Sequence, residues 1–341
     1  VGDRRWQPPE PADPWDPHMI RATAYRPVCP QDGPGWPSLD TSSASEDCLY
    51  LNVFRPEAVP APMPVLFWIH GGSFVHGGTN DAETDGCGFS DLTQGALVVT
   101  VQYRLGIFAG LGGDELRARD RNGTCGSYAL QDQILALRWV KEHIGSFGGD
   151  ANRITIVGES AGAGFVSSLL VAEGARGLFH GAVLQSGAFP AWSAKTHEQA
   201  QELYDEALSL SPCSNASCLA SLTTAELLGI QRRMTAVPDT WTRSRWAPTV
   251  DGKVLTVHPE AAVLAGRAGA FADVPVVVGV NQEEGTYFAT TDKFMRTFLS
   301  TSMSARDLRA WIGDNFPRDS ARIEAMYVDS AAALSPWAAA R

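Results

Sequence analysis

Short apolar runs recur along the chain, and segments with helical spacing of apolar residues separate them. Runs that are rich in β-branched residues predict buried strands, and they lie at 65–70, 96–103, 153–157, 182–185 and 274–280. The segments at 127–144, 163–172, 198–208 and 305–311 predict helices. Strands that alternate with helices predict an α/β fold with a mostly parallel central sheet and helices on both faces.

Residues 1–64 are rich in proline and show little periodicity, which predicts turns and loops. The chain has 341 residues and no internal repeat. This length suits one large α/β domain with a sizeable core, so we expect residues 1–341 to form a single domain.

Composition and charge narrow the class of partner. Hydrophobic residues make up 44% of the chain and charged residues 19%, which is typical of a globular protein. The net charge of −11 argues against nucleic acid or an anionic membrane as the partner. No apolar stretch of the sequence is long enough to cross a bilayer, so we expect no integral membrane segment.

The pentapeptide Gly158-Glu159-Ser160-Ala161-Gly162 lies between a predicted strand and a predicted helix. Strand, Gly-x-Ser-x-Gly and helix together predict a nucleophile elbow, in which a tight turn exposes the serine hydroxyl at a helix N-terminus. The pattern also arises by chance in a chain with 33 glycines, and the flanking strand and helix favour the elbow.

A second element, His70-Gly71-Gly72-Ser73-Phe74, directly follows a predicted core strand. Adjacent glycines there allow backbone N–H groups to point into a cavity and form an oxyanion hole, together with the N–H of Ala161. The alternative is a plain Gly-Gly turn, and the elbow downstream favours the oxyanion hole.

Six cysteines indicate an oxidising compartment. They form no Cys-x-x-Cys pair and no cluster with histidine, so we expect no metal site. Cys213 and Cys218 lie close together in a loop, which suits a small disulfide. Two glycosylation sequons begin at Asn122 and Asn215 and agree with secretion. The alternative is a cytosolic enzyme with six reduced thiols.

Several segments together resemble the type-B carboxylesterase/cholinesterase/lipase family of α/β hydrolases. They are Ser45 to Val53, Tyr103 to Gly106, Phe147 to Asp150 continuing to Gly162, Leu184 to Gly187, and Gly279 to Phe288. The resemblance covers nearly the whole chain and implies an α/β-hydrolase fold that is incomplete at both ends.

The resemblance also implies site residues. Ser160 would be the nucleophile, and the backbone of Gly72, Ser73 and Ala161 would hold the oxyanion. Glu284 would be the acid of the triad, with its neighbour Glu283 as the alternative. Without the family context, a solvated carboxylate at a strand end is the simpler interpretation of Glu284.

The order Ser, acid, His in this fold places the general base after Glu284, but none of the seven histidines follows His258. We therefore expect the catalytic histidine to lie beyond the end of this chain. The first residues, Asp3 to Pro9, resemble a segment that the family places after its first strands, so we expect both ends to be missing.

Disulfide pairing also follows from the resemblance, which implies Cys29–Cys48 and Cys213–Cys218. Cys87 and Cys125 are left over, and whether they pair stays open. The Cys29–Cys48 loop, where family lipases carry a lid, is short, which favours small or soluble esters over interfacial lipids.

Two further residue sets bear on the substrate. Trp36 either packs in its loop or forms a cation–π wall, and simple packing is favoured. The segment Trp241 to Pro248 resembles the family's acyl-pocket lining, and Thr242 and Ser244 in it predict a roomy pocket.

The sequence thus predicts a secreted serine carboxylic-ester hydrolase that acts on a small-molecule ester through an acyl-serine intermediate. No cofactor is expected. The alternatives are a catalytically inactive, esterase-like binding or adhesion protein and a lipase. Ser160, the glycines and Glu284 favour the enzyme, whereas the missing histidine fits the binding protein.

Overall fold

The computed structural model describes residues 4–13, 21–32, 39–57, 62–82, 85–93, 95–235, 242–266, 269–285 and 304–329. They belong to two compact units, Val1–Asp239 with Arg243–Val278, and Thr240–Thr242 with Gly279–Arg341. Trp36, Trp241 and residues 286–288, which the sequence analysis singled out, lie outside the described residues. The prediction of a single domain over residues 1–341 stays a prediction.

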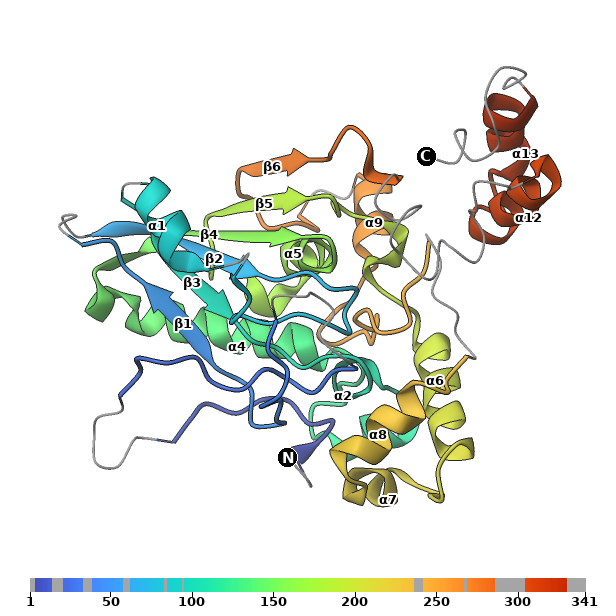
Figure 1. The fold of residues 1–341 in the computed structure, drawn as a ribbon, viewed down its shortest axis with the longest axis horizontal. Helices are drawn as coiled ribbons and strands as arrows, with labels where there is room; N and C mark the ends of the chain where they lie inside the picture. Colours follow the sequence, from blue (N-terminus) through green and yellow to red (C-terminus); the bar gives the residue numbers. More distant parts are fainter. Residues whose placement is uncertain are drawn as a thin grey trace. The chain divides into compact units, whose positions relative to one another are not determined.

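A six-stranded sheet forms the centre of the first unit (Figure 1). Its strands are β1 (Leu51–Phe54), β2 (Met63–Ile69), β3 (Leu97–Val101), β4 (Gly149–Glu159), β5 (Gly181–Gln185) and β6 (Val276–Gly279), in the order β1-β3-β2-β4-β5-β6. Strand β1 is antiparallel to β3, whereas β3, β2, β4 and β5 pair in parallel. The predicted mostly parallel sheet is therefore confirmed.

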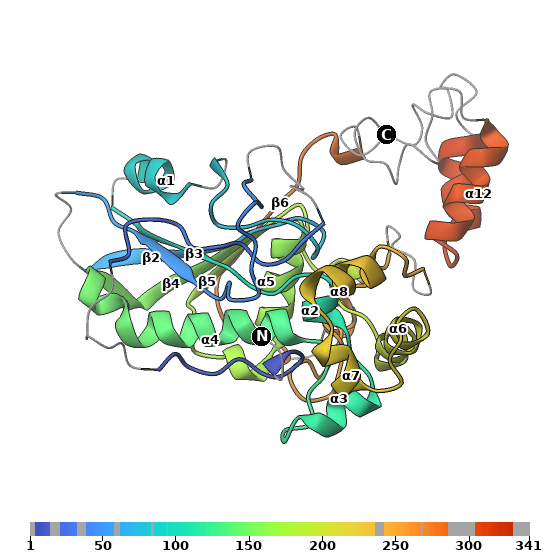
Figure 2. The ribbon, with the colours of Figure 1, turned by 60° about the horizontal axis from the view of Figure 1, so that its bottom comes forward.

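Helices cover both faces of this sheet, as its burial requires. Figure 2 shows α4 (Tyr128–His143) on one face and α1 (Gly86–Thr93) on the other. Helix α5 (Ala161–Val171) packs on β4 and β5 and also contacts α4. Every residue of β3 and of α5 is buried, so these two elements lie in the core.

Further helices complete the two units. The first unit also contains α2 (Ile107–Gly110), α3 (Asp114–Arg119), α6 (His197–Ser209), α7 (Ala216–Ser221), α8 (Thr224–Gln231) and α9 (Pro259–Leu264). The second unit contains α12 (Ala305–Asn315), α13 (Ser320–Glu324) and a π-helical turn, Ala325–Asp329. Capping boxes begin α6, α8 and α12, and each satisfies otherwise unpaired backbone N–H groups.

The prediction of loops for residues 1–64 is wrong at β1 and β2. Leu51 pairs with Val101, and Phe54 pairs with Val98, so β1 owes its strand conformation to β3. The pairing that stabilises β1 comes from a distant part of the chain, so the local sequence pattern does not contain it. Strand β2 begins at Met63, just before the segment predicted from Val65.

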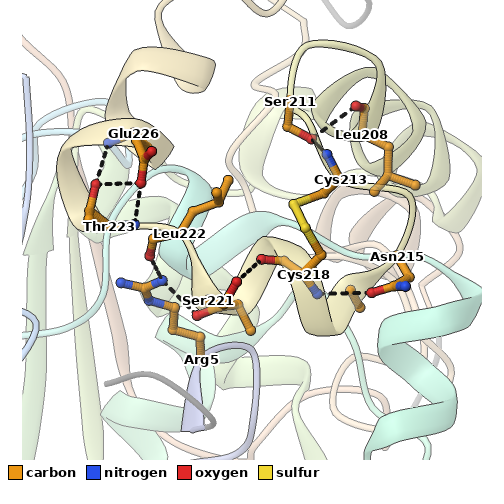
Figure 3. The surroundings of a disulfide bond; sticks show 12 residues. Arg5, Leu208, Ser211, Cys213, Asn215, Cys218, Ser221, Leu222, Thr223 and Glu226 are labelled. Carbon is orange, nitrogen blue, oxygen red and sulfur yellow. Dashed lines mark hydrogen bonds between the residues drawn. A yellow bond between two sulfur atoms is a disulfide. The ribbon is translucent and has the colours of Figure 1, made fainter.

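The N-terminal segment is anchored in the first unit by two side chains. Trp6 is fully buried, and its Nε1 donates to the Ile107 carbonyl at 2.8 Å. The guanidinium of Arg5 forms a buried ion pair with Glu46. It also donates to the carbonyls of Ala220 and Leu222, beside the Cys213–Cys218 disulfide (Figure 3).

Candidate active site

Ser160 occupies the turn between β4 and α5. Its backbone has φ 54° and ψ −122°, which is uncommon for a residue with a side chain. Its N–H donates to the Gln185 carbonyl at 2.9 Å, so β5 helps to hold the turn. The half-buried serine is the N-cap of the eleven-residue helix α5, where the helix dipole favours negative charge.

Two glycines allow this turn to pack closely against its neighbours. A Cβ on Gly162 would lie 2.1 Å from the Ile69 carbonyl oxygen, and a Cβ on Gly158 would lie 2.4 Å from the Gly162 carbonyl carbon. Neither distance is possible for a side chain, so the glycines of the pentapeptide are needed for close approach.

The turn after β2, Gly71 to Phe74, lies directly against the serine. A Cβ on Gly71 would lie 3.3 Å from the Ser160 Cβ. Val75 and His76 both donate their backbone N–H to the Gly72 carbonyl. Within the described residues, the N–H groups of Gly72, Ser73 and Ala161 have no protein acceptor. Gly72 and Ala161 are buried, whereas Ser73 is exposed. Buried N–H groups are normally paired, so this set can accept a ligand oxygen.

His70, which precedes this turn, has a structural position. Its ring is buried and stacks on Tyr103 with 4.2 Å between ring centroids. The Tyr103 hydroxyl donates to the His70 carbonyl at 2.6 Å. Burial lowers the pKa of His70 to about 4, so the imidazole is neutral at physiological pH.

An aromatic cluster packs against Phe74, the last residue of this turn. Phe74 packs edge-on against Phe165 at 5.0 Å and against Trp192 at 6.0 Å, and Tyr103 packs on Phe165 at 5.0 Å. No sequence motif predicted Trp192 as part of this region. The sequence shows only that Trp192 follows the end of a predicted strand, and this position is too common among tryptophans to indicate a site.

Known proteins resemble the chain in sequence and in fold. A profile described as "Carboxylesterase family" matches residues 1–334. The chain belongs to the carboxylesterase family. It is 33% identical to the para-nitrobenzyl esterase of Bacillus subtilis (strain 168) over 296 residues, which is 86% of this chain and 58% of that enzyme. It is 36% identical to carboxylesterase 1C of Rattus norvegicus over 306 residues, which is 83% of this chain and 51% of that enzyme.

Solved structures extend the likeness to the fold. A structure titled PNB esterase matches with a TM-score of 0.80 and 32% identity, covering 96% of this chain and 65% of that one. The α/β-hydrolase fold that the sequence predicted is therefore confirmed. The chain spans between half and two thirds of these carboxylesterase relatives. Among the helices that the structure describes, none is both long and apolar enough to span a bilayer.

Glu284, the acid that the family resemblance implies, lies in the second unit. Its Oε1 accepts the backbone N–H of Asn281 at 2.8 Å, and the residue is half-buried, whereas Glu283 is exposed. The choice of Glu284 over Glu283 as the acid stays a prediction. The role of Glu284 stays a proposal.

The side chains of His197 and His258 contact groups other than the Ser160 hydroxyl. His197 Nε2 lies 2.8 Å from Asp114 Oδ1, and His197 Nδ1 lies 3.2 Å from Arg117 Nη2 and 3.7 Å from Cys125 Sγ. Nε2 of His258 lies within hydrogen-bond distance of two backbone carbonyls. Within the described residues, no histidine hydrogen-bonds to Ser160.

Both disulfides that the family resemblance implied are present. Cys29–Cys48 has a Cα–Cα distance of 5.0 Å, and Cys213–Cys218 has one of 5.4 Å. Cys87 and Cys125 do not pair, because Cys87 is exposed on α1 whereas Cys125 is buried beside His197. The pairing that the sequence left open is therefore not formed.

The two sequon asparagines, Asn122 and Asn215, are exposed. Asn215 is also the N-cap of α7, where its Oδ1 accepts the backbone N–H of Cys218 at 2.9 Å. Figure 3 shows this cap next to the disulfide. The cap uses the oxygen of the amide and leaves its nitrogen, the atom that carries an N-linked glycan, without a role in the cap.

Proposed function

We propose that this chain carries the nucleophile and the oxyanion donors of a serine carboxylesterase that acts on small or soluble esters. The main support is the positive φ of Ser160 beside a turn in which the N–H groups of Gly72 and Ser73 have no acceptor among the described residues. A packed core alone gives no reason to keep both features, because backbone strain costs stability and so do the unpaired N–H groups of the buried residues Gly72 and Ala161.

In the proposed reaction, the Ser160 hydroxyl oxygen attacks the ester carbonyl carbon while a general base takes its proton. The carbonyl oxygen becomes an oxyanion, which the N–H groups of Gly72, Ser73 and Ala161 stabilise. The bond to the alcohol then breaks, and the alcohol leaves with the proton. Water cleaves the acyl-serine by the same route and regenerates the hydroxyl.

We assign the triad acid to Glu284, which would orient a histidine and stabilise its protonated form. Glu283 is the alternative. That the histidine follows Glu284 and lies beyond this chain stays a prediction, based on the chain order of the fold.

The substrate class rests on two weaker observations. The Cys29–Cys48 disulfide closes a loop with a sequence separation of only 19, which leaves little length for a lid. Thr242 donates its hydroxyl to the Asn315 carbonyl at 3.0 Å, and Ser244 is half-buried. That Thr242 and Ser244 line a roomy acyl pocket stays a prediction.

We also propose that the protein is secreted and N-glycosylated at Asn122 and Asn215. The two disulfides and the exposure of both asparagines support this. A loss of mass after treatment of the secreted protein with an N-glycosidase would support the assignment, and an unchanged mass would contradict it.

The decisive experiment compares the full-length gene product with residues 1–341 alone on p-nitrophenyl butyrate. We expect Ser160-dependent turnover by the full-length protein and a kcat about a million-fold lower without the base. Glu284→Gln should lower kcat by about ten thousand-fold, because the acid orients the base, whereas Glu283→Gln serves as the matched control.

Three outcomes would contradict parts of this proposal. A folded full-length protein without Ser160-dependent turnover would favour the binding protein. A strong preference for emulsified long-chain esters would favour a lipase. Robust Ser160-dependent turnover by residues 1–341 alone would show that one of their own histidines is the base.

A further inference from the structure

We propose that Gln31 is a positioning residue for the segment from His70 to Gly77 (the oxyanion turn), which contains the proposed donors Gly72 and Ser73. The Gln31 amide, which lies in the Cys29–Cys48 loop, would fix the C-terminal end of this turn. This inference rests on the proposed esterase function. It assigns the side chain an effect on the rate of the chemical step, in addition to its contribution to stability.

The Gln31 side chain pairs with the backbone of Gly77 through two reciprocal bonds. Nε2 of Gln31 donates to the Gly77 carbonyl at 2.9 Å, and the Gly77 N–H donates to Oε1 of Gln31 at 3.0 Å. The second hydrogen on Nε2 serves the Cys29 carbonyl at 3.1 Å. Gln31 is 7% exposed, so water cannot easily replace these bonds.

Gly77 is the last residue of the oxyanion turn, and its backbone conformation and close packing require glycine. Its φ is 108°, and a Cβ there would lie 2.3 Å from Nδ1 of His70. The residue before it, His76, donates its N–H to the Gly72 carbonyl at 2.9 Å. A shift of Gly77 therefore moves the N–H of His76, which is hydrogen-bonded to the Gly72 carbonyl. Gly72 moves with it, and the N–H of Gly72 is a proposed oxyanion donor.

The turn is thus held at both ends by side chains from other segments. Tyr103 holds its start through the His70 carbonyl, and Gln31 holds its end through Gly77. Between these two anchors, the N–H groups of Gly72 and Ser73 have no acceptor among the described residues to fix their direction. Their alignment on an oxyanion then depends on the anchors, because such donors must be in place before the charge develops.

Gln31→Ala removes the whole anchor, and Gln31→Glu keeps the shape and the acceptor but removes the donors. In the full-length enzyme we expect Gln31→Ala to lower kcat by about 10- to 100-fold, less than the loss of an oxyanion donor itself, with KM changed by less than about 3-fold. Gln31→Glu should fall between Gln31→Ala and the wild type.

The matched control is Gln201→Ala. Gln201 lies on α6, and its Oε1 accepts the backbone N–H of Asp114 at 2.8 Å, outside the oxyanion turn. We expect this variant to keep the wild-type kcat. All rates are divided by the number of active sites, counted by the p-nitrophenol burst, so that a loss of folded protein does not mimic a loss of catalysis.

A second measurement separates positioning from stability. A trifluoromethyl ketone forms a hemiketal oxyanion on a nucleophilic serine, and its Ki should rise in Gln31→Ala by the same factor as kcat/KM falls. Gln31→Ala with a wild-type kcat per active site and an unchanged Ki overturns the proposal, even if its melting temperature is lower. Wild-type enzyme without Ser160-dependent turnover would overturn the proposed function itself, and this inference with it.

Discussion

Around the proposed nucleophile, four residues with side chains have positive φ angles: Ser73, Phe74, Ser160 and Ser186. Each such residue costs about 1–3 kcal/mol, so the surrounding structure must hold it in place. The Ser160 N–H donates to the Gln185 carbonyl, and the Phe74 carbonyl accepts the N–H of Gly106 at 2.8 Å. At the scale of single residues, the strain is concentrated where the proposed reaction takes place.

The close approach of Gly162 to β2 gives a first prediction. Gly162→Ala should lower the free energy of unfolding by about 1–3 kcal/mol, because its Cβ would lie 2.1 Å from the Ile69 carbonyl oxygen. Urea unfolding measures this change. Gly145→Ala is the control, since a Cβ there meets no atom within 4 Å. Equal effects of the two substitutions would contradict the steric argument.

The Arg5–Glu46 pair gives a prediction about pH. Burial alone would raise the pKa of Glu46, but hydrogen bonds from Arg5 and Thr224 and the charge of Arg5 lower it below its usual 4.5. A carboxylate with a lowered pKa stabilises the fold above pH 4.5, and this contribution is lost as the pH falls through the folded-state pKa. Acid should therefore remove what the pair contributes.

Glu46→Gln should lower the free energy of unfolding by about 3 kcal/mol at pH 7, because it leaves Arg5 buried without its anion. As the pH falls below 4.5 and through the folded-state pKa of Glu46, the difference from the wild type should shrink. Urea titrations across this pH range test this, with Glu10→Gln in an exposed ion pair as the control, expected to change stability by less than about 1 kcal/mol. A difference that is independent of pH would contradict the assignment.

At the scale of elements, the long periodic helices were predictable and the short helices were not. The helix expected over 127–144 is α4, Tyr128–His143, and the helix expected over 198–208 is α6, His197–Ser209. Helix α7 has only six residues, and its cap at Asn215 and the Cys213–Cys218 disulfide determine it more than its own periodicity does. Such short elements depend on tertiary contacts that a local pattern does not contain.

In the candidate site, too, local motifs were predictable from the sequence and long-range contacts were not. Ser160 and the Gly71–Gly72 turn were found because their chemistry requires a local motif with fixed spacing. Tyr103 and Gln31 act on that turn through hydrogen bonds that span 33 and 46 residues of sequence. No local pattern encodes these bonds, so the supporting residues became visible only in the folded chain.

Strand β6 was predicted as a buried strand, and the structure confirms the strand but not its burial. It is the edge strand of the sheet, and Val276, Val277 and Val278 are 43–61% exposed. An exposed apolar edge is a template for pairing with another strand. We therefore expect residues 1–341 alone to self-associate.

Val277→Lys should shift residues 1–341 toward the monomer in sedimentation velocity, because a charged edge opposes strand pairing. The control is Leu264→Lys, which changes an apolar residue that is 80% exposed on α9 rather than on the sheet edge. If both substitutions reduce association equally, general surface hydrophobicity is the cause, and the edge-pairing explanation is wrong.

At the scale of the whole molecule, the first unit is held together by contacts between remote segments. The N-terminal segment places Trp6 against the start of α2 and Arg5 between the signature residue Glu46 and the end of α7. Glu46 is part of a segment on which the family resemblance rests, yet its contacts are structural. A sequence signature of this family therefore includes residues that hold the scaffold as well as residues proposed to act on the substrate.

The attachment of Arg5 also sets an order of events during protein synthesis. Its carbonyl partners, Ala220 and Leu222, lie 215 and 217 residues later in the sequence. At translation rates of roughly 5–20 residues per second, the ribosome reaches them on the order of 10–40 s after it adds Arg5. Until then the N-terminal segment has no complete docking site, so it can close onto the unit only late in translation.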